Sequence, residues 1–566
     1  MDTRYSKPEK PENRFILWAV ALLGFSSTAT QIIVLREMLN IFSGNELITG
    51  IVISSWMLLT GAGAWLGKKQ IFRIKRVVQC ILWLSVLPIL LIVILYTVKR
   101  LFFPLGVLID FRLIFPVTLL LLAPYCLVSG HLFAHFTALA QQKRVYFRAD
   151  RLYGIETVGS VVGGITVGLI LIGGFSTVVS LSIILTINVI VAYFVENKFR
   201  ISYLFFAAGV ILLFLMPLDA WLKKLVFPNQ QILQSRETPY GNVTITRSAN
   251  QFSIFANHSL LYSSQNIIEN EETVHFSMLQ RPSPGNILLI SGGTRGLVTE
   301  ILKYLTVQRV DYVEENRWML KLMQSVDTLP ANPRFSIILS DIRKYLAQIP
   351  NQVYDVVILA VPPPSTLQTN RYYTLEFFRL LKPHLRKNAI VELALPSSSS
   401  YYSSRNLELQ SLIVTTLKKE FSNVLVIPGE KDYVLASTQA ISAEVASLSE
   451  QRGIATSYVN RYYIDDFTLE QQVKLLNQAL IGSDINHDFK PLAVYFSNNR
   501  YMSMFSVKTI MLLLPLLVLL WPVVKLKPAT LALYVSGFSI SALEVFLLLS
   551  FQIVFGFVYV ASGIII

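Results

Sequence analysis

The sequence predicts a multi-span α-helical membrane bundle that carries an inserted α/β soluble domain of the Rossmann-like type, and three observations lead to this fold class. First, 53% of the 566 residues are hydrophobic and only 15% are charged, whereas soluble proteins carry about a quarter charged residues. Second, the apolar residues gather in runs of roughly 20, the length that crosses the hydrocarbon core of a bilayer. Third, short apolar strands alternate with helical segments between these runs, which is typical of a parallel, doubly wound sheet.

Nine apolar runs are candidate transmembrane spans, at residues 15–35, 47–67, 77–97, 113–136, 154–175, 176–196, 201–217, 505–525 and 528–550. The first run is too long, and too soon followed by others, to be a cleaved signal peptide. We therefore divide the chain into an N-terminal transmembrane bundle (1–217), a soluble domain (218–440), a mixed helix and loop segment (441–500) and C-terminal spans (501–566).

The net charge of +14 reflects basic loops beside the spans rather than a nucleic-acid surface. These loops hold Lys68, Lys69, Arg73, Lys75 and Arg76, and then Lys143, Arg144, Arg148 and Arg151. Cations beside spans stay on the cytoplasmic side of a membrane. We therefore expect a multi-pass protein of the inner cell membrane that contacts the lipid bilayer and binds no nucleic acid.

The last span repeats part of the first in a gapless register. Gly24-Phe25-Ser26 recurs as Gly537-Phe538-Ser539, and Gln31 matches Glu544. Internal repeats of this kind are frequent in transporter-like bundles. The second copy has no cationic flank like the one the first copy has at Lys68 and Lys69. We expect the 528–550 run to cross or re-enter the membrane without the partner helix of its N-terminal counterpart.

Glu156 stands out among the polar residues of the apolar runs. A carboxylate at membrane depth is costly and usually points into the bundle, but an interfacial position, paired with Arg151 or solvated, would also explain it. Together with Gln31 and Glu544, Glu156 makes a candidate polar site of the bundle. His131 and His135 lie one helical turn apart, and without a third ligand nearby we expect no metal site.

The soluble stretch begins with hairpin-like alternation at 236–262, and a Rossmann-like region follows at 286–440. Its candidate strands are 286–291, 309–314, 335–339, 355–361, 388–393, 423–428 and 433–436. The first strand runs into the loop Ser291-Gly292-Gly293-Thr294-Arg295-Gly296 and then into a helix. Gly292, Gly293 and Gly296 let the backbone turn sharply and approach a ligand at the helix N-terminus. The alternative is that these glycines only tighten a turn between strand and helix.

Two acids follow the next two strands of this region. Glu314 ends the second strand, 18 residues after Gly296, where an acid can accept hydrogen bonds from ribose hydroxyls. Asp341 follows the third strand, placed to meet an adenine ring. A dinucleotide site would have another glycine at the position of Ser291. The order of strand, glycine loop, helix and two acid-ended strands therefore predicts a nucleoside site.

At this point the chain resembles the membrane-embedded spermidine synthase-like proteins of bacteria over nearly its whole length. The matching motifs are 153–160 (YGIETVGS), 240–243 (YGNV), 271–275 (EETVH), the glycine loop 292–296, 311–314 (DYVE), 364–366 (PST) and 370–374 (NRYYT). Spermidine synthases move an aminopropyl group from decarboxylated S-adenosylmethionine to putrescine. The resemblance implies that Glu314 holds ribose, Asp341 the adenine side, and the glycine loop the methionine-derived tail. It implies an adenosyl co-substrate and a polyamine, and no tightly bound cofactor.

The chain departs from this family on the acceptor side of the site. Soluble spermidine synthases carry an Asp in the glycine loop, where this chain has Thr294, and a D-x-x-D-P signature whose two acids are replaced here by Ala360 and Pro363. A diamine is a dication near neutral pH, so its pocket needs carboxylates that offset the charge. Glu271 and Glu272 are the candidate acceptor-side acids that remain, although they lie in another motif.

The sequence leaves three functions open. The first is an aminopropyltransferase of polyamine metabolism with little or no activity on putrescine, or a relative that uses a different acceptor. The second is a transporter or sensor whose soluble domain binds an adenosyl compound without turnover, and the third is a membrane-bound methyltransferase. Adenosyl donors are cytoplasmic, so we expect a cytoplasmic soluble domain. Seven spans after a cytoplasmic N-terminus would place that domain outside, and we attribute this difference to one miscounted span.

Overall fold

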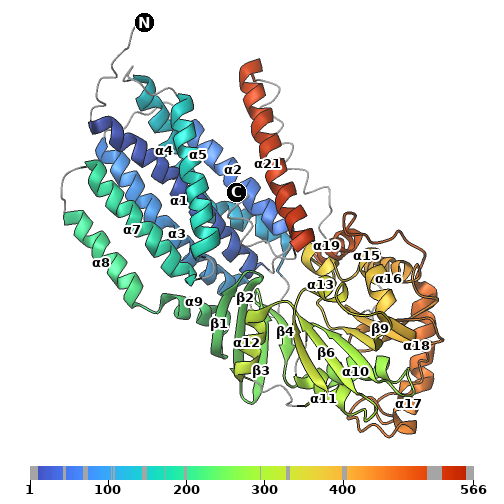
Figure 1. The fold of residues 1–566 in the computed structure, drawn as a ribbon. Coiled ribbons are helices and arrows are strands. Elements are labelled where there is room, and N and C mark those ends of the chain that lie inside the picture. The colour runs from blue at the N-terminus through green and yellow to red at the C-terminus, as the bar shows by residue number, and fades with distance from the viewer. Residues whose placement is uncertain are drawn as a thin grey trace.

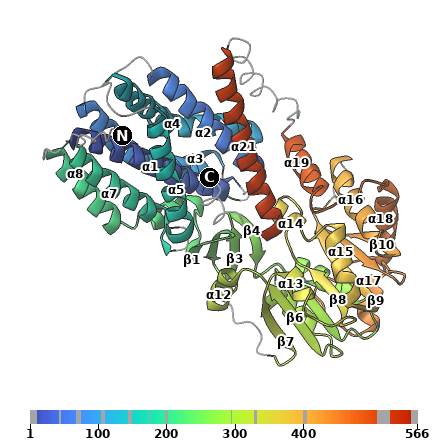
Figure 2. The ribbon, with the colours of Figure 1, turned by 45° about the horizontal axis from the view of Figure 1, so that its top comes forward.

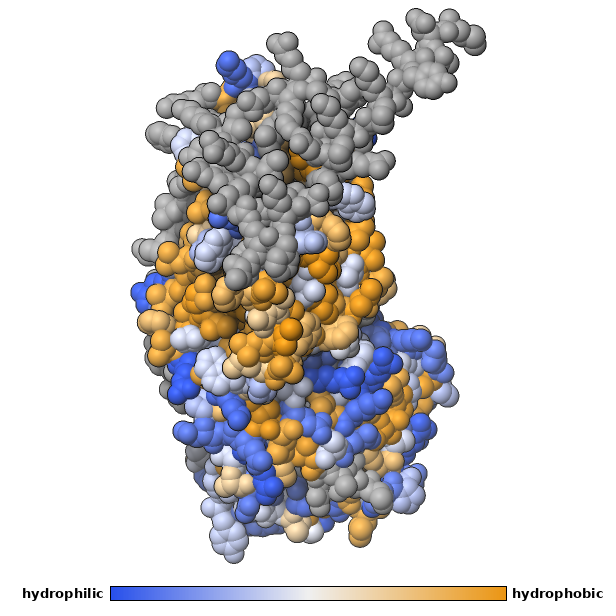
Figure 3. All heavy atoms as spheres, turned by 90° about the vertical axis from the view of Figure 1, so that its left-hand side faces the viewer, coloured by the Kyte–Doolittle hydropathy of each residue, from blue (hydrophilic) through white to orange (hydrophobic). Residues whose placement is uncertain are grey.

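The computed structural model of the chain describes residues 11–42, 46–67, 74–103, 105, 109–142, 149–171, 174–196, 201–292, 295–326, 332–397, 404–505 and 526–555. A helical bundle forms one end of the molecule and a mixed α/β domain the other, and the N-terminus lies at the end of the bundle farthest from that domain (Figure 1). Apolar residues cover the side of the bundle seen in Figure 3, whereas polar residues are frequent on the α/β domain.

The N-terminal bundle follows the predicted apolar runs closely. Its elements are α1 (Pro11–Ile41), α2 (Glu46–Gly67), α3 (Ile74–Phe102), α4 (Phe111–Gln142), α5 (Ala149–Ile165) with the π-helical turn η1 (Thr166–Leu171), α7 (Thr177–Glu196), α8 (Ile201–Leu215) and α9 (Leu218–Val226). Among the described residues, seven helices are long and apolar enough to cross a membrane, α21 (Pro528–Phe555) included. Their length and composition agree with the predicted spans, and insertion itself stays a prediction.

Two of the predicted spans have a different outcome. The 201–217 run folds as α8, whose 15 residues reach membrane length only together with α9, from which α8 is bent by 60°. The 505–525 run lies outside the described residues except for Phe505. Six of the described helices before the soluble domain are therefore long and apolar enough to span a membrane by themselves, and α8, which runs beside α7 (Figure 1), is the span that the expected miscount would remove.

Close helix packing in the bundle depends on glycines. A Cβ added to Gly24 of α1 would lie 2.1 Å from the Glu156 carbonyl oxygen, and one added to Gly159 of α5 would lie 2.0 Å from the Ala21 carbonyl oxygen. Gly63 of α2 approaches Leu127 of α4 in the same way. Small residues let membrane helices pack backbone against backbone, so α1 pairs with α5 and α2 pairs with α4.

The three residues of the candidate bundle site are not brought together by a described contact. Glu156 is half-buried and its carboxylate accepts a hydrogen bond from the Ser160 hydroxyl at 3.3 Å. Gln31 is buried in α1. Glu544 lies on α21, which contacts α2 through the Ser541 hydroxyl and the Met57 sulfur at 3.0 Å. The polar site of the bundle therefore stays a prediction.

A different polar cluster ties the bundle together near the α/β domain. The Glu37 carboxylate accepts hydrogen bonds from the Tyr96 hydroxyl at 2.9 Å and from the Thr177 hydroxyl, and Arg36 donates to Thr177 at 2.7 Å. Nearby, the Glu46 carboxylate accepts the backbone N–H of Leu367 at 2.7 Å. This last bond joins the start of α2 directly to the α/β domain.

The soluble part begins with a small antiparallel sheet of four strands in sequential order. They are β1 (Gln231–Thr238), β2 (Gly241–Ser248), β3 (Gln251–Ala256) and β4 (Ser259–Ser263). The predicted hairpin at 236–262 therefore belongs to a larger meander that begins earlier. This small sheet lies between the bundle and the larger sheet (Figure 1).

The larger sheet has the strand order β10-β11-β9-β8-β5-β6-β7. Its strands are β5 (Asn286–Ile290), β6 (Arg309–Glu314), β7 (Phe335–Leu339), β8 (Tyr354–Leu359), β9 (Leu385–Leu395), β10 (Asn423–Pro428) and β11 (Asp432–Ser437). The first five are parallel, as expected. The last two pair antiparallel, because the three residues between them can form a hairpin turn but no crossover.

Helices cover both faces of this sheet over two apolar cores, as a Rossmann-like fold requires. They are α10 (Ile267–Met278), α11 (Arg295–Leu302), α12 (Arg317–Val326), α13 (Ile342–Leu346), α14 (Leu367–Asn370), α15 (Leu375–Leu381), η2 (Lys382–His384), α16 (Ser404–Leu417), α17 (Val445–Gln451), α18 (Asp466–Ala479) and α19 (Leu492–Met504). From a second direction, α19 and α21 lie on the side of the domain that faces the bundle (Figure 2).

Candidate functional site

A cavity of about 310 Å³ lies between the small sheet and the carboxyl ends of β5, β8 and β9. Strands β3 and β4 form one wall, and α10, α12 and the turn after β5 form others. The loop Ala360–Pro363 after β8 closes a further side. Ligands of open α/β sheets bind in the crevice at the carboxyl ends of the strands, so this cavity is the candidate site.

The glycine turn after β5 is built around a close contact with the loop after β8. Ser291 and Gly292 both have positive φ angles, +55° and +57°. A Cβ on Gly292 would lie 2.2 Å from the carbonyl oxygen of Ala360 and 2.7 Å from its Cβ. Both residues line the cavity. Gly292 therefore does more than tighten a turn, because it lets two walls of the cavity meet.

The other two glycines of the loop have different outcomes. Gly296 lies in the first turn of α11, where an added Cβ would lie 2.4 Å from the Asn270 amide nitrogen. Because Gly296 has no side chain, α10 can approach α11 closely. Asn270, on α10, lines the cavity. Gly293 lies outside the described residues, as does Thr294.

Glu314 ends β6 as predicted, and its buried carboxylate is fixed by three hydrogen bonds. One oxygen accepts the backbone N–H of Asn316 at 2.8 Å. The other accepts the Ser291 hydroxyl at 2.9 Å and the Tyr312 hydroxyl at 3.0 Å. Burial raises the pKa of Glu314, and its hydrogen bonds oppose this shift. The acid is thereby coupled to the glycine turn through Ser291.

Asp341 follows β7 and combines a structural contact with an ion pair. One carboxylate oxygen caps α13 by accepting the Lys344 N–H at 3.0 Å, and the other pairs with Arg371 at 2.7 Å. Arg371 also lies 4.0 Å from Glu315. Burial raises the pKa of Glu315 to about 7, and Arg371 opposes this shift. The sequence predicted no role for Glu315, which follows Glu314, or for Arg371, which lies in the matching motif 370–374.

The two candidate acceptor-side acids point elsewhere. Glu271 is buried and accepts the backbone N–H groups of Ser457 and Tyr458 at 2.7 Å and of Val459 at 3.1 Å. It therefore holds the loop after α17. Glu272 accepts the backbone N–H of Glu430 at 2.7 Å, and burial raises its pKa to about 7. Neither is among the residues that line the cavity.

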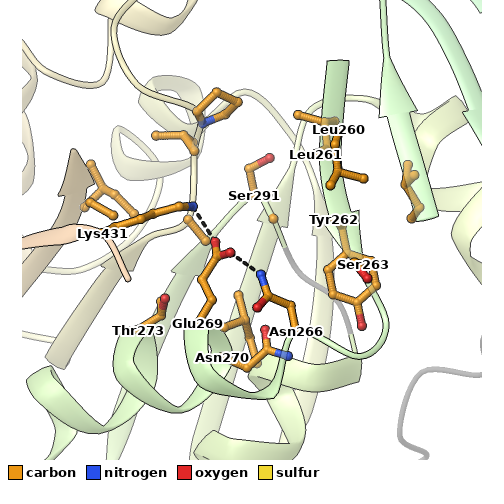
Figure 4. A pocket seen from close by; sticks show the side chains of 18 of the residues that line it. Leu260, Leu261, Tyr262, Ser263, Asn266, Glu269, Asn270, Thr273, Ser291 and Lys431 are labelled. Atoms are coloured by element: carbon orange, nitrogen blue, oxygen red, sulfur yellow. Dashed lines mark hydrogen bonds and ion pairs between the residues drawn. The ribbon is translucent and has the colours of Figure 1, made fainter. Parts of the chain in front are cut away.

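The charged residues that line the cavity are Glu269, Lys431 and Glu392. Glu269, on α10, forms an ion pair with Lys431 and accepts a hydrogen bond from Asn266 (Figure 4). Glu392 lies on β9, and only 1% of its surface is exposed. Glu392 interrupts the apolar run of residues 389–395, which is the signal by which the sequence could have revealed it.

Comparisons with known proteins agree with this fold. The Spermine/spermidine synthase domain family matches residues 266–427. A polyamine aminopropyltransferase of Leptospira interrogans is 29% identical over 171 residues, which cover 29% of this chain and 34% of that protein. Polyamine aminopropyltransferase 2 of Aquifex aeolicus is 25% identical over 291 residues, covering 48% of this chain and 55% of that protein.

The chain therefore spans about a third to a half of the length of these relatives. Among solved structures, spermidine synthase in complex with the transition-state analogue AdoDATO is 16% identical, with a TM-score of 0.39 over 44% of this chain and 88% of that one. Residues 266–427 form a spermidine synthase-like domain.

Proposed function

We propose that this spermidine synthase-like domain binds an S-adenosyl donor in the cavity and transfers an aminopropyl group from decarboxylated S-adenosylmethionine to an amine. The helical bundle holds the domain at a membrane. The observation that carries the proposal is the coupling of Glu314 to the glycine turn through Ser291 at 2.9 Å. In nucleotide sites of this fold an acid at the end of the second strand binds ribose, and the resemblance to spermidine synthases places the methionine-derived tail at the turn after the first strand.

The donor half of the site is built mainly from backbone and apolar surface. Gly292 presents backbone to the cavity, and Leu297, Met319 and Met323 add apolar contacts. Such a surface suits the body of an adenosyl thioether, because ligand pockets combine apolar walls with a few polar groups that fix orientation. In the reaction the acceptor nitrogen attacks the propyl carbon bonded to sulfur, the carbon–sulfur bond breaks, and its electron pair goes to sulfur.

The acceptor half is poor in the charge that a diamine needs. Ala360 and Pro363 line the cavity at the two positions where the D-x-x-D-P signature of soluble spermidine synthases has acids. Glu269 is already paired with Lys431. We therefore propose slow turnover of putrescine. A missing general base lowers rates by roughly 10²–10⁴-fold, and lost counter-charge weakens binding further.

Calorimetry on the purified full chain tests donor binding. We expect 5′-methylthioadenosine and decarboxylated S-adenosylmethionine to bind, and Glu314→Ala to abolish this binding. Glu408→Ala is the matched control, because Glu408 lies at the surface of α16 and pairs only with Arg405 among the described contacts. Absence of binding by the unaltered chain would refute the proposal. Methyl transfer from intact S-adenosylmethionine would assign a methyltransferase instead.

A further inference from the structure

Glu392 is a carboxylate buried within the cavity without an ordinary partner. Among the described residues, no donor lies at hydrogen-bonding distance and angle from either side-chain oxygen of Glu392. Burying an unpaired carboxylate is costly. Because an apolar residue would fill this position of a central strand at no such cost, the acid points to a ligand that supplies the missing partner.

The position of Glu392 relates it to the acid that the acceptor site lacks. Glu392 pairs with Ile358 in the parallel register of β8 and β9, so the two side chains lie on the same face of the sheet. Ala360 lies two residues after Ile358, directly beyond the end of β8, a separation of about 7 Å at the rise of a strand. Ala360 and Glu392 both line the cavity. A carboxylate on the neighbouring strand thus enters the same space as the missing one.

The charges of the cavity lining set the number of cations it can neutralise. Lys431 forms its ion pair with Glu269 (Figure 4), so this acid already has a cation. Glu392 is the one remaining acid of the described lining. The rest of the wall is largely apolar, with Leu260 and Leu261 of β4 and Ile254 of β3. One available acid in an apolar cavity matches a ligand with one amino group and a hydrocarbon body.

We propose that the acceptor is a primary monoamine with an apolar body, and that Glu392 binds its nitrogen and removes its proton. This inference rests on the proposed aminopropyl transfer. The ammonium group of the acceptor gives one proton to the Glu392 carboxylate, and the free amine attacks the propyl carbon of the donor. A nitrogen–carbon bond forms, the carbon–sulfur bond breaks toward sulfur, and the products are methylthioadenosine and an N-(3-aminopropyl) amine. The secondary ammonium product keeps the two remaining hydrogens and carries the positive charge that sulfur loses, and Glu392 returns its proton to solvent.

Burial makes Glu392 a stronger base than an exposed carboxylate, and a bound ammonium group favours its charged form. Burial raises the pKa of its carboxyl group well above the ordinary value, the Glu272 charge raises it further, and the Ser277 hydroxyl opposes the shift. The ordinary carboxyl value of 4.5 would make Glu392 a weaker base.

The test compares n-pentylamine with 1,4-diaminobutane, which have similar length but one and two amino groups. With the full chain saturated by methylthioadenosine, we expect pentylamine to bind at least about tenfold more tightly. With decarboxylated S-adenosylmethionine, we expect mass spectrometry to detect N-(3-aminopropyl)pentylamine. Glu392→Gln should lose pentylamine binding and lower kcat/KM by roughly 10²–10⁴-fold, whereas methylthioadenosine binding stays unchanged. Glu408→Gln is the matched surface control.

The outcomes separate this inference from the proposed function. Tighter binding of the diamine, or pentylamine binding that survives Glu392→Gln, overturns the assignment of a monoamine to Glu392. Loss of amine binding in Glu272→Gln but not in Glu392→Gln gives the amine to the other acid and overturns it equally. Glu392-dependent binding of pentylamine without transfer supports the amine site and refutes the aminopropyl transfer proposed above.

Discussion

Gly292→Ala tests whether the contact between the turn after β5 and the loop after β8 holds the cavity in shape. Two costs apply at this position. Gly292 has a φ of +57°, and a side chain in the left-handed region costs about 1–2 kcal/mol. The added Cβ would also lie 2.2 Å from the Ala360 carbonyl oxygen, and overpacking of this kind costs about 1–3 kcal/mol. The sum is about 2–5 kcal/mol.

Gly453→Ala is the matched control because it separates the two costs. Gly453 has a similar φ of +64°, and a Cβ there would meet nothing within 4 Å. We therefore expect only the conformational cost of about 1–2 kcal/mol. Since 1 kcal/mol shifts the melting temperature of a domain of 150–250 residues by roughly 2–4 °C, Gly292→Ala should melt several degrees below Gly453→Ala.

The assay is thermal unfolding of the full chain, followed by titration with methylthioadenosine. We expect Gly292→Ala to weaken nucleoside binding, because the turn must move away from Ala360 and carries Ser291, the partner of Glu314, with it. Gly453→Ala should bind as the unaltered chain does. Equal melting temperatures for the two variants would refute the close contact, and unchanged binding in Gly292→Ala would remove the turn from the site.

Three further predictions follow from the acids and the bundle. In the chain without a bound amine, folded and unfolded states both hold the Glu392 proton below pH 4.5, its ordinary value. Between that pH and the raised pKa of the folded state only the folded state holds it, so stability falls as pH rises. The melting temperature of Glu392→Gln relative to the unaltered chain should therefore increase between pH 5 and pH 8, and parallel pH profiles would contradict the raised pKa. Ser291→Ala removes one hydrogen bond to Glu314 and should weaken methylthioadenosine binding by about tenfold, in line with roughly 1–1.5 kcal/mol for such a bond; unchanged affinity in calorimetry would show that the bond does not shape the site. A tag inserted near Gln230 should be protected from external protease in intact cells, because adenosyl donors are cytoplasmic. The basic residues from Lys68 onward follow the end of α2 that points away from the α/β domain, and cations beside spans favour the cytoplasmic side. The charge pattern therefore argues against the expected result, and cleavage of the tag would place the domain outside.

Much of the fold follows from local patterns in the sequence. Eight of the nine apolar runs correspond to helices α1–α5, α7, α8 and α21, and the strands 309–314, 335–339 and 423–428 match β6, β7 and β10 residue for residue. Periodicity and run length depend on near neighbours, so the sequence reports them directly. The same holds for the turn at Gly292, where a positive φ favours glycine, and for Glu314 at the end of its strand. These features were correctly predicted.

The composition of the cavity depended on the tertiary structure. Glu271 lies two positions after Glu269 on α10, so a rotation of about 200° turns it away from the cavity that Glu269 faces. Glu272 lies only about 60° from Glu269, but its carboxylate accepts the backbone N–H of Glu430. Glu392 lies beside the loop of Ala360 only because β9 pairs with β8 in the sheet. Arg371 reaches Asp341 across 30 residues of sequence. Strand order and helix rotation are set by packing between distant segments, and for that physical reason the sequence determined the glycine turn and the acid-ended strand but not which acids line the cavity.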